Sequence, residues 1–184
     1  TVAQGSMRGL NIGGLGTVAQ GEMRGINIAG LGTVAQGGMR WINLAGVGVV
    51  AQGSIEGLST ALGGVVAQGP IRGLSVGGGA VVAANSPLTG GAIALGEVRA
   101  SVLSGLGVAG YRVRSEETRG LSIGLIRLQV GTMRGIGIGG YNRMNVQRGL
   151  AIGVYNRADE LHGVQIGLLN YAGNASMKYL PLVN

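Results

Sequence analysis

Apolar and polar residues recur at fixed positions along this chain, and the pattern repeats every sixteen residues. The first copy reads TVAQGSMRGLNIGGLG and the second TVAQGEMRGINIAGLG. A fixed period of this length is typical of repeat architectures. Seven consecutive copies begin at Thr1, Thr17, Thr33, Val49, Val65, Val81 and Glu97.

Aligned on this period, the residues fall into apolar and polar columns. The second position is Val in every copy, the seventh is Met or Ile in the first five copies, and the tenth and twelfth positions are mostly Leu, Ile or Val. With these columns inside and the polar columns outside, each copy has the alternation of a strand. The polar columns are Arg8, Arg24, Arg40, Glu56 and Arg72 at the eighth position, and Asn11, Asn27, Asn43, Ser59 and Ser75 at the eleventh.

Glycines interrupt this alternation at the fifth, ninth, fourteenth and sixteenth positions of the copies. Glycine adopts backbone angles closed to other residues, so it indicates corners and close chain approaches. So many glycines exclude a helix. The pattern predicts an all-β fold, a β-solenoid whose identical columns stack at the strand spacing of about 4.8 Å. An antiparallel β-meander is the alternative.

The second half of the chain has a shorter period. From about Ser104 the copies begin near Arg119, Arg134, Arg148 and His162, at spacings of fifteen, fourteen and fourteen residues. We expect a solenoid of sixteen-residue coils over 1–112, its continuation with shorter coils over 113–174, and a C-terminal cap over 175–184. The charged segment GYRVRSEE (110–117) is predicted to be a protruding loop where the two periods meet.

A family resemblance adds an expectation about location. The segments RGLAIGVYN, GVQIGLLN and LPLVN resemble the bacterial surface-repeat proteins first named from Leptospira, whose repeats read approximately Gly-x-Gln-x-Gly-x-x-Asn. The resemblance is strongest over 119–184 and looser over the first half, where the Gln and Asn positions are lost and the coils are longer. It implies an exported, periplasmic or membrane-associated protein of the bacterial envelope and specifies no activity.

Composition narrows the kind of partner. The chain has 184 residues with 40 glycines, no phenylalanine and no cysteine, so disulfides and thiolate metal sites are excluded. Its net charge is +7, almost all of the cations being arginine. This balance favours an anionic partner. The alternative is that the arginines only keep a glycine-rich rod in solution. Nucleic acid is disfavoured because the basic half lacks interleaved aromatic residues and lysine is nearly absent.

No residue pattern indicates catalysis, a cofactor or a metal. His162 is the single histidine, and although Asp159 and Glu160 lie close before it, it occupies the position that arginine fills in the preceding copies. The segments GLGVAG and GIGIGG match a dinucleotide-binding glycine pattern, but that motif requires a following helix to receive the phosphate. We therefore expect no enzymatic activity.

Two surfaces are candidates for binding. Stacked coils would bring Arg8, Arg24, Arg40 and Arg72 into one column. Their guanidinium groups could form bidentate hydrogen bonds with phosphates or carboxylates. The alternative surface comprises Tyr141, Asn142, Tyr155 and Asn156, which would serve an adhesin or carbohydrate-binding repeat protein.

The function expected from these features is that of a structural and protein–protein interaction module of the bacterial envelope. It would dock through its side-chain columns onto a larger protein assembly or an anionic lipid surface. The first copy has no cap, and because an open coil exposes core and strand edges, we expect either that other protein subunits cover it or that further residues precede it.

Overall fold

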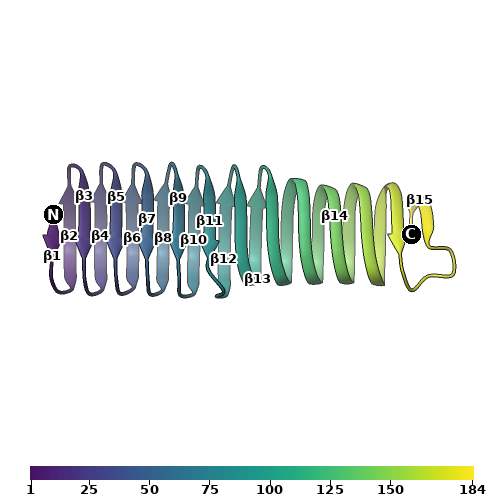
Figure 1. Ribbon diagram of the computed structural model, residues 1–184, viewed down its shortest axis with the longest axis horizontal. Helices are drawn as coiled ribbons and strands as arrows, with labels where there is room; N and C mark the ends of the chain where they lie inside the picture. Colours follow the sequence, from purple (N-terminus) through teal and green to yellow (C-terminus); the bar gives the residue numbers. More distant parts are fainter.

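The protein is a long rod of stacked β-strands. The computed structural model describes residues 1–184 and contains strands but no helix. Figure 1 shows the chain winding from one end of the rod to the other, so that its two ends lie at opposite ends of the molecule. This arrangement confirms the predicted β-solenoid.

Two short strands alternate in each of the early coils, and they merge into longer strands later. The last coils follow one continuously paired segment, β14, which winds around the rod (Figure 1). The strands are β1 (Val2–Ala3), β2 (Met7–Gly13), β3 (Gly16–Ala19), β4 (Met23–Ala29), β5 (Gly32–Ala35), β6 (Met39–Ala45), β7 (Gly48–Ala51), β8 (Ile55–Ala61), β9 (Gly64–Ala67), β10 (Ile71–Gly77), β11 (Ala80–Ala83), β12 (Leu88–Ala94), β13 (Glu97–Ala109), β14 (Arg112–Ala172) and β15 (Tyr179–Val183).

Neighbouring coils pair in parallel. The odd-numbered strands β1 to β11 form one row, the even-numbered strands β2 to β12 form another, and β13 joins both. Met7 pairs with Met23, and Met23 with Met39, an offset of one sixteen-residue copy at each step. The alternative of an antiparallel meander is therefore wrong. The one antiparallel pairing joins β14 to β15, which folds back along the last coil.

One coil departs from the expected alignment. Val65 pairs with Val81 sixteen residues later, but Val81 pairs with Val98 after seventeen residues, and Val98 with Val113 after fifteen. The extra residue lies in the corner at Asn85, whose φ is +52°. The copy predicted to begin at Val81 is in phase, but the one predicted to begin at Glu97 is out of phase by one residue, because Val98 holds the first position.

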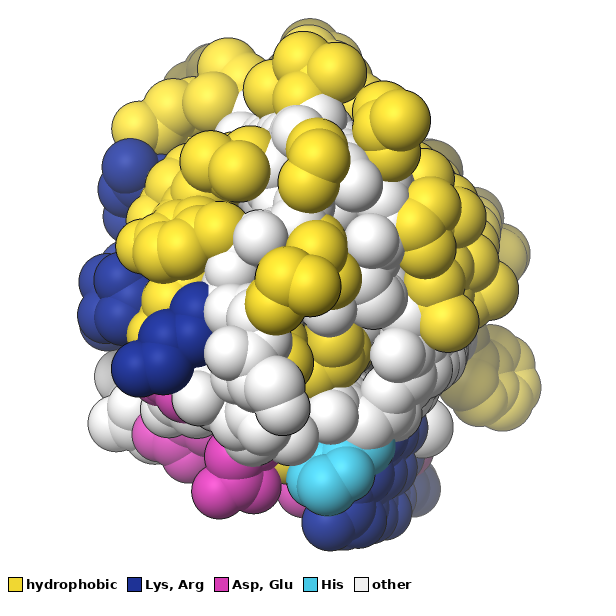
Figure 2. All heavy atoms as spheres, turned by 90° about the vertical axis from the view of Figure 1, so that its right-hand side faces the viewer, with side chains coloured by type: hydrophobic (Ala, Val, Ile, Leu, Met, Phe, Trp, Pro, Cys, Tyr) yellow, Lys and Arg dark blue, Asp and Glu magenta, His cyan; other side chains and the backbone are white.

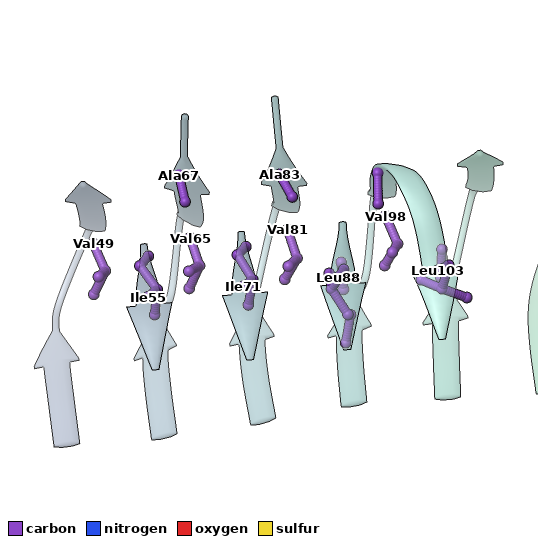
Figure 3. Close-up of a cluster of buried hydrophobic side chains, with 14 of the residues drawn as sticks. Val49, Ile55, Val65, Ala67, Ile71, Val81, Ala83, Leu88, Val98 and Leu103 are labelled. Atoms are coloured by element: carbon purple, nitrogen blue, oxygen red, sulfur yellow. The ribbon is translucent and has the colours of Figure 1, made fainter. Parts of the chain in front are cut away.

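A narrow hydrophobic core runs inside the rod. Each coil contributes a few inward side chains, such as Val65, Ala67 and Ile71, all fully buried. Figure 3 shows these positions recurring from coil to coil, with equivalent side chains in rows along the rod. Small and medium side chains suffice because the two rows of strands lie close together.

The phase of the alternation differs from the predicted one for several columns. The methionines point inward and the arginines outward, as expected, but Val18 and Val34 point outward and Asn27 and Asn43 are completely buried. Buried asparagine is tolerated because the amides bond along the stack: Asn27 Nδ2 donates to Asn43 Oδ1 at 2.9 Å. The apolar second, tenth and twelfth positions therefore face outward instead of filling the core.

The charged segment 110–117 is not a protruding loop. Its residues from Arg112 onward belong to β14 and pair with β13, with Arg112 opposite Glu97 and Arg114 opposite Arg99. Val113 and Ser115 are buried between outward-facing charged side chains. The segment is an ordinary strand with an unusually charged outer side.

The ninth position of the copies is a column of glycines with positive φ, including Gly25 at +122° and Gly57 at +105°. A Cβ atom on Gly25 would collide with the backbone carbonyl of Gly9 in the preceding coil. Trp41 occupies the same column with φ of +87°, a conformation that L side chains rarely adopt. Tryptophan at this position is strained.

Candidate functional site

One column of arginine positions extends along most of the rod. Arg8, Arg24, Arg40, Glu56 and Arg72 occupy equivalent positions in successive coils, as the sixteen-residue period predicts. The pairing continues through Thr89 and Ser104 to Arg119. Beyond it, each of Arg134, Arg148 and His162 precedes a glycine stacked on that of the previous coil. The arginines of the two halves therefore form one column.

Glutamates neutralise part of this column. Glu56 lies within it and contacts Arg40 at 3.4 Å and Arg72 at 3.8 Å. Glu117 contacts Arg119 at 2.9 Å, and the hydrogen bond from Arg119 lowers the pKa of Glu117. Arg24 pairs with Glu22, Arg134 with Glu117, and Arg8 and Arg148 pair with no carboxylate. The column thus keeps an excess of positive charge.

An apolar surface runs beside the arginine column. The tenth and twelfth positions, together with the corner residues at about the fifteenth, expose large aliphatic side chains in coil after coil; Leu15 is 76% and Leu95 77% exposed. Viewed along the rod, hydrophobic side chains cover the upper part of the molecule and charged ones gather at the left and below (Figure 2). Because exposed apolar surfaces of this extent are common at interaction sites, this one is a candidate.

Trp41 lies at the boundary between these two surfaces. It follows Arg40 of the arginine column and precedes Ile42 of the apolar tenth column, and its side chain is 70% exposed. Residues held in strained backbone conformations concentrate at functional sites. The column pattern alone does not indicate Trp41 as a site residue, although it is the one tryptophan of the chain and replaces a repeated glycine.

In the alternative surface of tyrosines and asparagines, the tyrosines reach the outside of the rod but the asparagines do not. Tyr141 and Tyr155 stack with ring centroids 5.2 Å apart, and burial is the main cause that raises the pKa of Tyr155. Asn142 and Asn156, however, are fully buried. Asn142 Nδ2 donates to Asn156 Oδ1 at 2.6 Å, and Asn156 Nδ2 donates to the carbonyl oxygen of Ile166. These asparagines stabilise the interior and do not reach a ligand at the surface.

The motif Gly-x-Gln-x-Gly-x-x-Asn has a structural explanation in its last copy. Gly163 and Gly167 lie against the backbone of the preceding coil, where a Cβ atom would collide with a carbonyl oxygen. Gln165 and Asn170 are buried, and Gln165 Nε2 donates to Gln147 Oε1 at 3.0 Å. The glycines permit close stacking and the amides fill the interior.

The isolated ionisable groups form no recognisable reaction centre. His162 Nε2 lies 4.0 Å from Glu160 Oε2, and both side chains are more than half exposed. No group of three or more His, Cys, Asp or Glu side chains is positioned to hold a metal ion. Of the two glycine-rich segments that match a dinucleotide-binding pattern, 105–110 lies at the end of β13 and 135–140 lies within β14, and no helix follows either.

Comparison with known proteins places no further constraint on the site. The chain matches no protein-family model, no curated protein and no solved structure. None of its elements is a helix with the length and apolar character needed to cross a membrane. The fold defines the class: the protein is a β-solenoid repeat protein.

Proposed function

We propose that the protein is a non-enzymatic structural and interaction module of the bacterial envelope, and that its side-chain columns dock onto an anionic membrane surface. The envelope location rests on the resemblance of the 119–184 half to bacterial surface-repeat proteins. The observation that carries the docking proposal is the arginine column, with Arg8, Arg24 and Arg40 on three successive coils, beside an exposed aliphatic surface.

The two neighbouring surfaces fit the two layers of a membrane interface. Aliphatic side chains gain free energy by leaving water, in proportion to the apolar area that they bury. Guanidinium groups form strong hydrogen bonds with phosphates, and each cation near an anionic bilayer contributes about 1 kcal/mol. Because the column repeats at the strand spacing of about 4.8 Å, several arginines reach the same flat surface together.

Trp41 supports this orientation. Tryptophan favours membrane interfaces, where its ring contacts the apolar region and its indole N–H remains near polar groups. Its position between Arg40 and Ile42 is the boundary at which such a ring would lie. Docking would explain why the rod carries an exposed aromatic side chain on a strained backbone.

The single tryptophan provides a direct test. Trp41 fluorescence would be recorded as the protein is titrated with vesicles of phosphatidylglycerol or of phosphatidylcholine. We expect a blue shift with the anionic vesicles only. The variant R8Q/R24Q/R40Q should bind them on the order of 100-fold more weakly, given the contribution of about 1 kcal/mol from each cation.

The variant R99Q/R114Q/R143Q is the matched control, because it removes three charges from a different part of the rod. It should bind the anionic vesicles within about threefold of the unmodified protein. Equal losses of affinity in the two variants would show that binding depends on net charge alone. That result would contradict docking through the column. Absence of any shift, together with recovery of the protein in a stable protein complex from native membranes, would favour a protein assembly as the docking surface.

A further inference from the structure

A polar groove lies on the outer side of β13 and the first coils of β14, at residues that precede the arginine column in each coil. Its volume is about 790 Å³. Three arginines and one glutamate, Glu116, are its charged residues. The arginines are Arg99, Arg114 and Arg143, and all three side chains are exposed.

The groove lies where the outward-facing column changes from valine to arginine. Val66 pairs with Val82, Val82 pairs with Arg99, and Arg99 pairs with Arg114. An apolar column therefore becomes a basic one at β13. The strands pair in parallel on both sides of this change, although the coil lengths differ, and valine and arginine occupy the same outward position.

The guanidinium groups of the groove are only partly neutralised. Arg99 contacts Glu97 at 3.1 Å, whereas Arg114 and Arg143 contact no carboxylate. Arg99 and Arg114 lie on adjacent coils, about 5 Å apart, where like charges repel one another unless an anion lies between them. Arg143 lies two coils beyond Arg114, with Gln129 on the coil between. This arrangement favours a ligand that carries more than one negative charge.

The remaining lining supplies groups that suit hydroxyls. Gln129, Thr132 and Asn145 present amide and hydroxyl groups to the groove. A smaller cavity of about 120 Å³ is lined by Gln129, Arg127, Arg143 and Tyr141. Arg127 lies over the ring of Tyr141, 5.6 Å from its centroid. Charge, hydroxyl-binding groups and an aromatic ring are thus close together.

We infer that this groove binds a segment of an anionic polysaccharide. Arg114 and Arg143 bind its carboxylate or sulfate groups through bidentate hydrogen bonds. Gln129, Thr132 and Asn145 bind its hydroxyls. A neutral glycan lacks the first set of contacts. A nucleic acid strand finds only one tyrosine on which to stack, whereas single-stranded binding sites use several aromatic rings. The site is independent of the membrane-docking column.

Affinity electrophoresis tests this inference. The protein would be run through native gels containing polygalacturonate, which is carboxylated, or heparin, which is sulfated, with dextran as the neutral polymer. We expect retardation by at least one of the anionic glycans and none by dextran. The variant R114Q/R143Q should bind at least about tenfold more weakly, since it loses two charge-assisted contacts.

Two further variants separate the groove from general charge. R8Q/R24Q removes the same number of charges elsewhere and should bind as the unmodified protein does. Gln129→Glu adds a negative charge between the arginines and should weaken binding. The inference is overturned if neither anionic glycan retards the protein, if R8Q/R24Q loses as much affinity as R114Q/R143Q, or if a single-stranded oligodeoxynucleotide displaces the glycan at lower concentration. Circular dichroism of each variant verifies the fold.

Discussion

Thr33 and Val49 occupy the same inward position in successive coils, and both are completely buried. The hydroxyl of Thr33 has no hydrogen-bond partner there, and neither does that of Thr17 one coil earlier. A buried polar group without a partner costs about 1–3 kcal/mol. This column therefore has two unpaired buried hydroxyls, which the later copies avoid by using valine.

Replacing both threonines with valine should stabilise the rod. T17V/T33V removes two unpaired hydroxyls while keeping the shape of the side chains, so we expect the free energy of unfolding to rise by about 2 kcal/mol. Urea denaturation measures the difference. Thr60→Val, at an outward and partly exposed position, is the control and should change stability by less than about 0.5 kcal/mol. Equal effects at the inner and outer sites would contradict this explanation.

Replacing a large aromatic residue usually destabilises a protein, but we expect replacement of Trp41 by glycine to relieve backbone strain. Its side chain buries little surface, and its φ is +87°. Trp41→Gly should be more stable than Trp41→Ala by about 1–2 kcal/mol, because alanine retains the backbone strain and glycine removes it. Comparing these two variants by thermal unfolding isolates the backbone effect from loss of the ring. A more stable alanine variant would show that the conformation costs nothing.

The glycine column should tolerate no side chain. A Cβ atom on Gly57 would meet the carbonyl of Trp41, and the φ of Gly57 is +105°. Gly57→Ala should therefore destabilise the protein by about 2 kcal/mol or more. Gly14 has open space around its Cβ position and an ordinary φ, so Gly14→Ala should be nearly neutral. Urea denaturation of the two variants distinguishes stacking from a general effect of losing glycine.

Glu97 links two coils and makes stability depend on pH. It contacts Arg112 at 2.9 Å and Arg99 at 3.1 Å. Partial burial acts to raise the pKa of Glu97, but the hydrogen bonds and charges of Arg112 and Arg99 outweigh it, and the pKa falls below its ordinary value of 4.5. A lowered folded-state pKa stabilises the folded protein above the unfolded-state value, and that stabilisation is lost as the pH falls through the folded-state value.

Glu97→Gln should accordingly be less stable than the unmodified protein at neutral pH, and the difference should shrink as the pH falls below 4.5. Unfolding free energies measured across this range give the result. Glu160→Gln is the control, because the Glu160 carboxylate contacts no arginine. A difference between Glu97→Gln and the unmodified protein that stays constant with pH would exclude the ion pairs as its cause.

The period of the sequence was sufficient to predict the stacking, but not which side of each strand faces the core. Met7, Met23 and Met39 recur at one spacing, and only stacked coils bring them together. Asn27 is different: strand alternation alone permits either phase, and its inward position depends on hydrogen bonds between coils, which have no signal in a single copy.

The two errors near the change of period have separate causes. The seventeen-residue coil between Val81 and Val98 is followed by a fifteen-residue coil ending at Val113, so the average period hides the shift. The segment 110–117 was assigned to a loop because it is highly charged. Its alternation was nevertheless that of a strand, with Val113 and Ser115 buried between charged neighbours.

The bend at Asn85 also shows how such a protein can change in length. The corner absorbs one extra residue, and the coils on both sides remain aligned. An insertion at a corner is therefore a local event, whereas one inside a strand would turn every following side chain to the opposite face. Evolution can lengthen this molecule by duplicating whole turns, and each duplication extends every surface stripe without redesigning the rest.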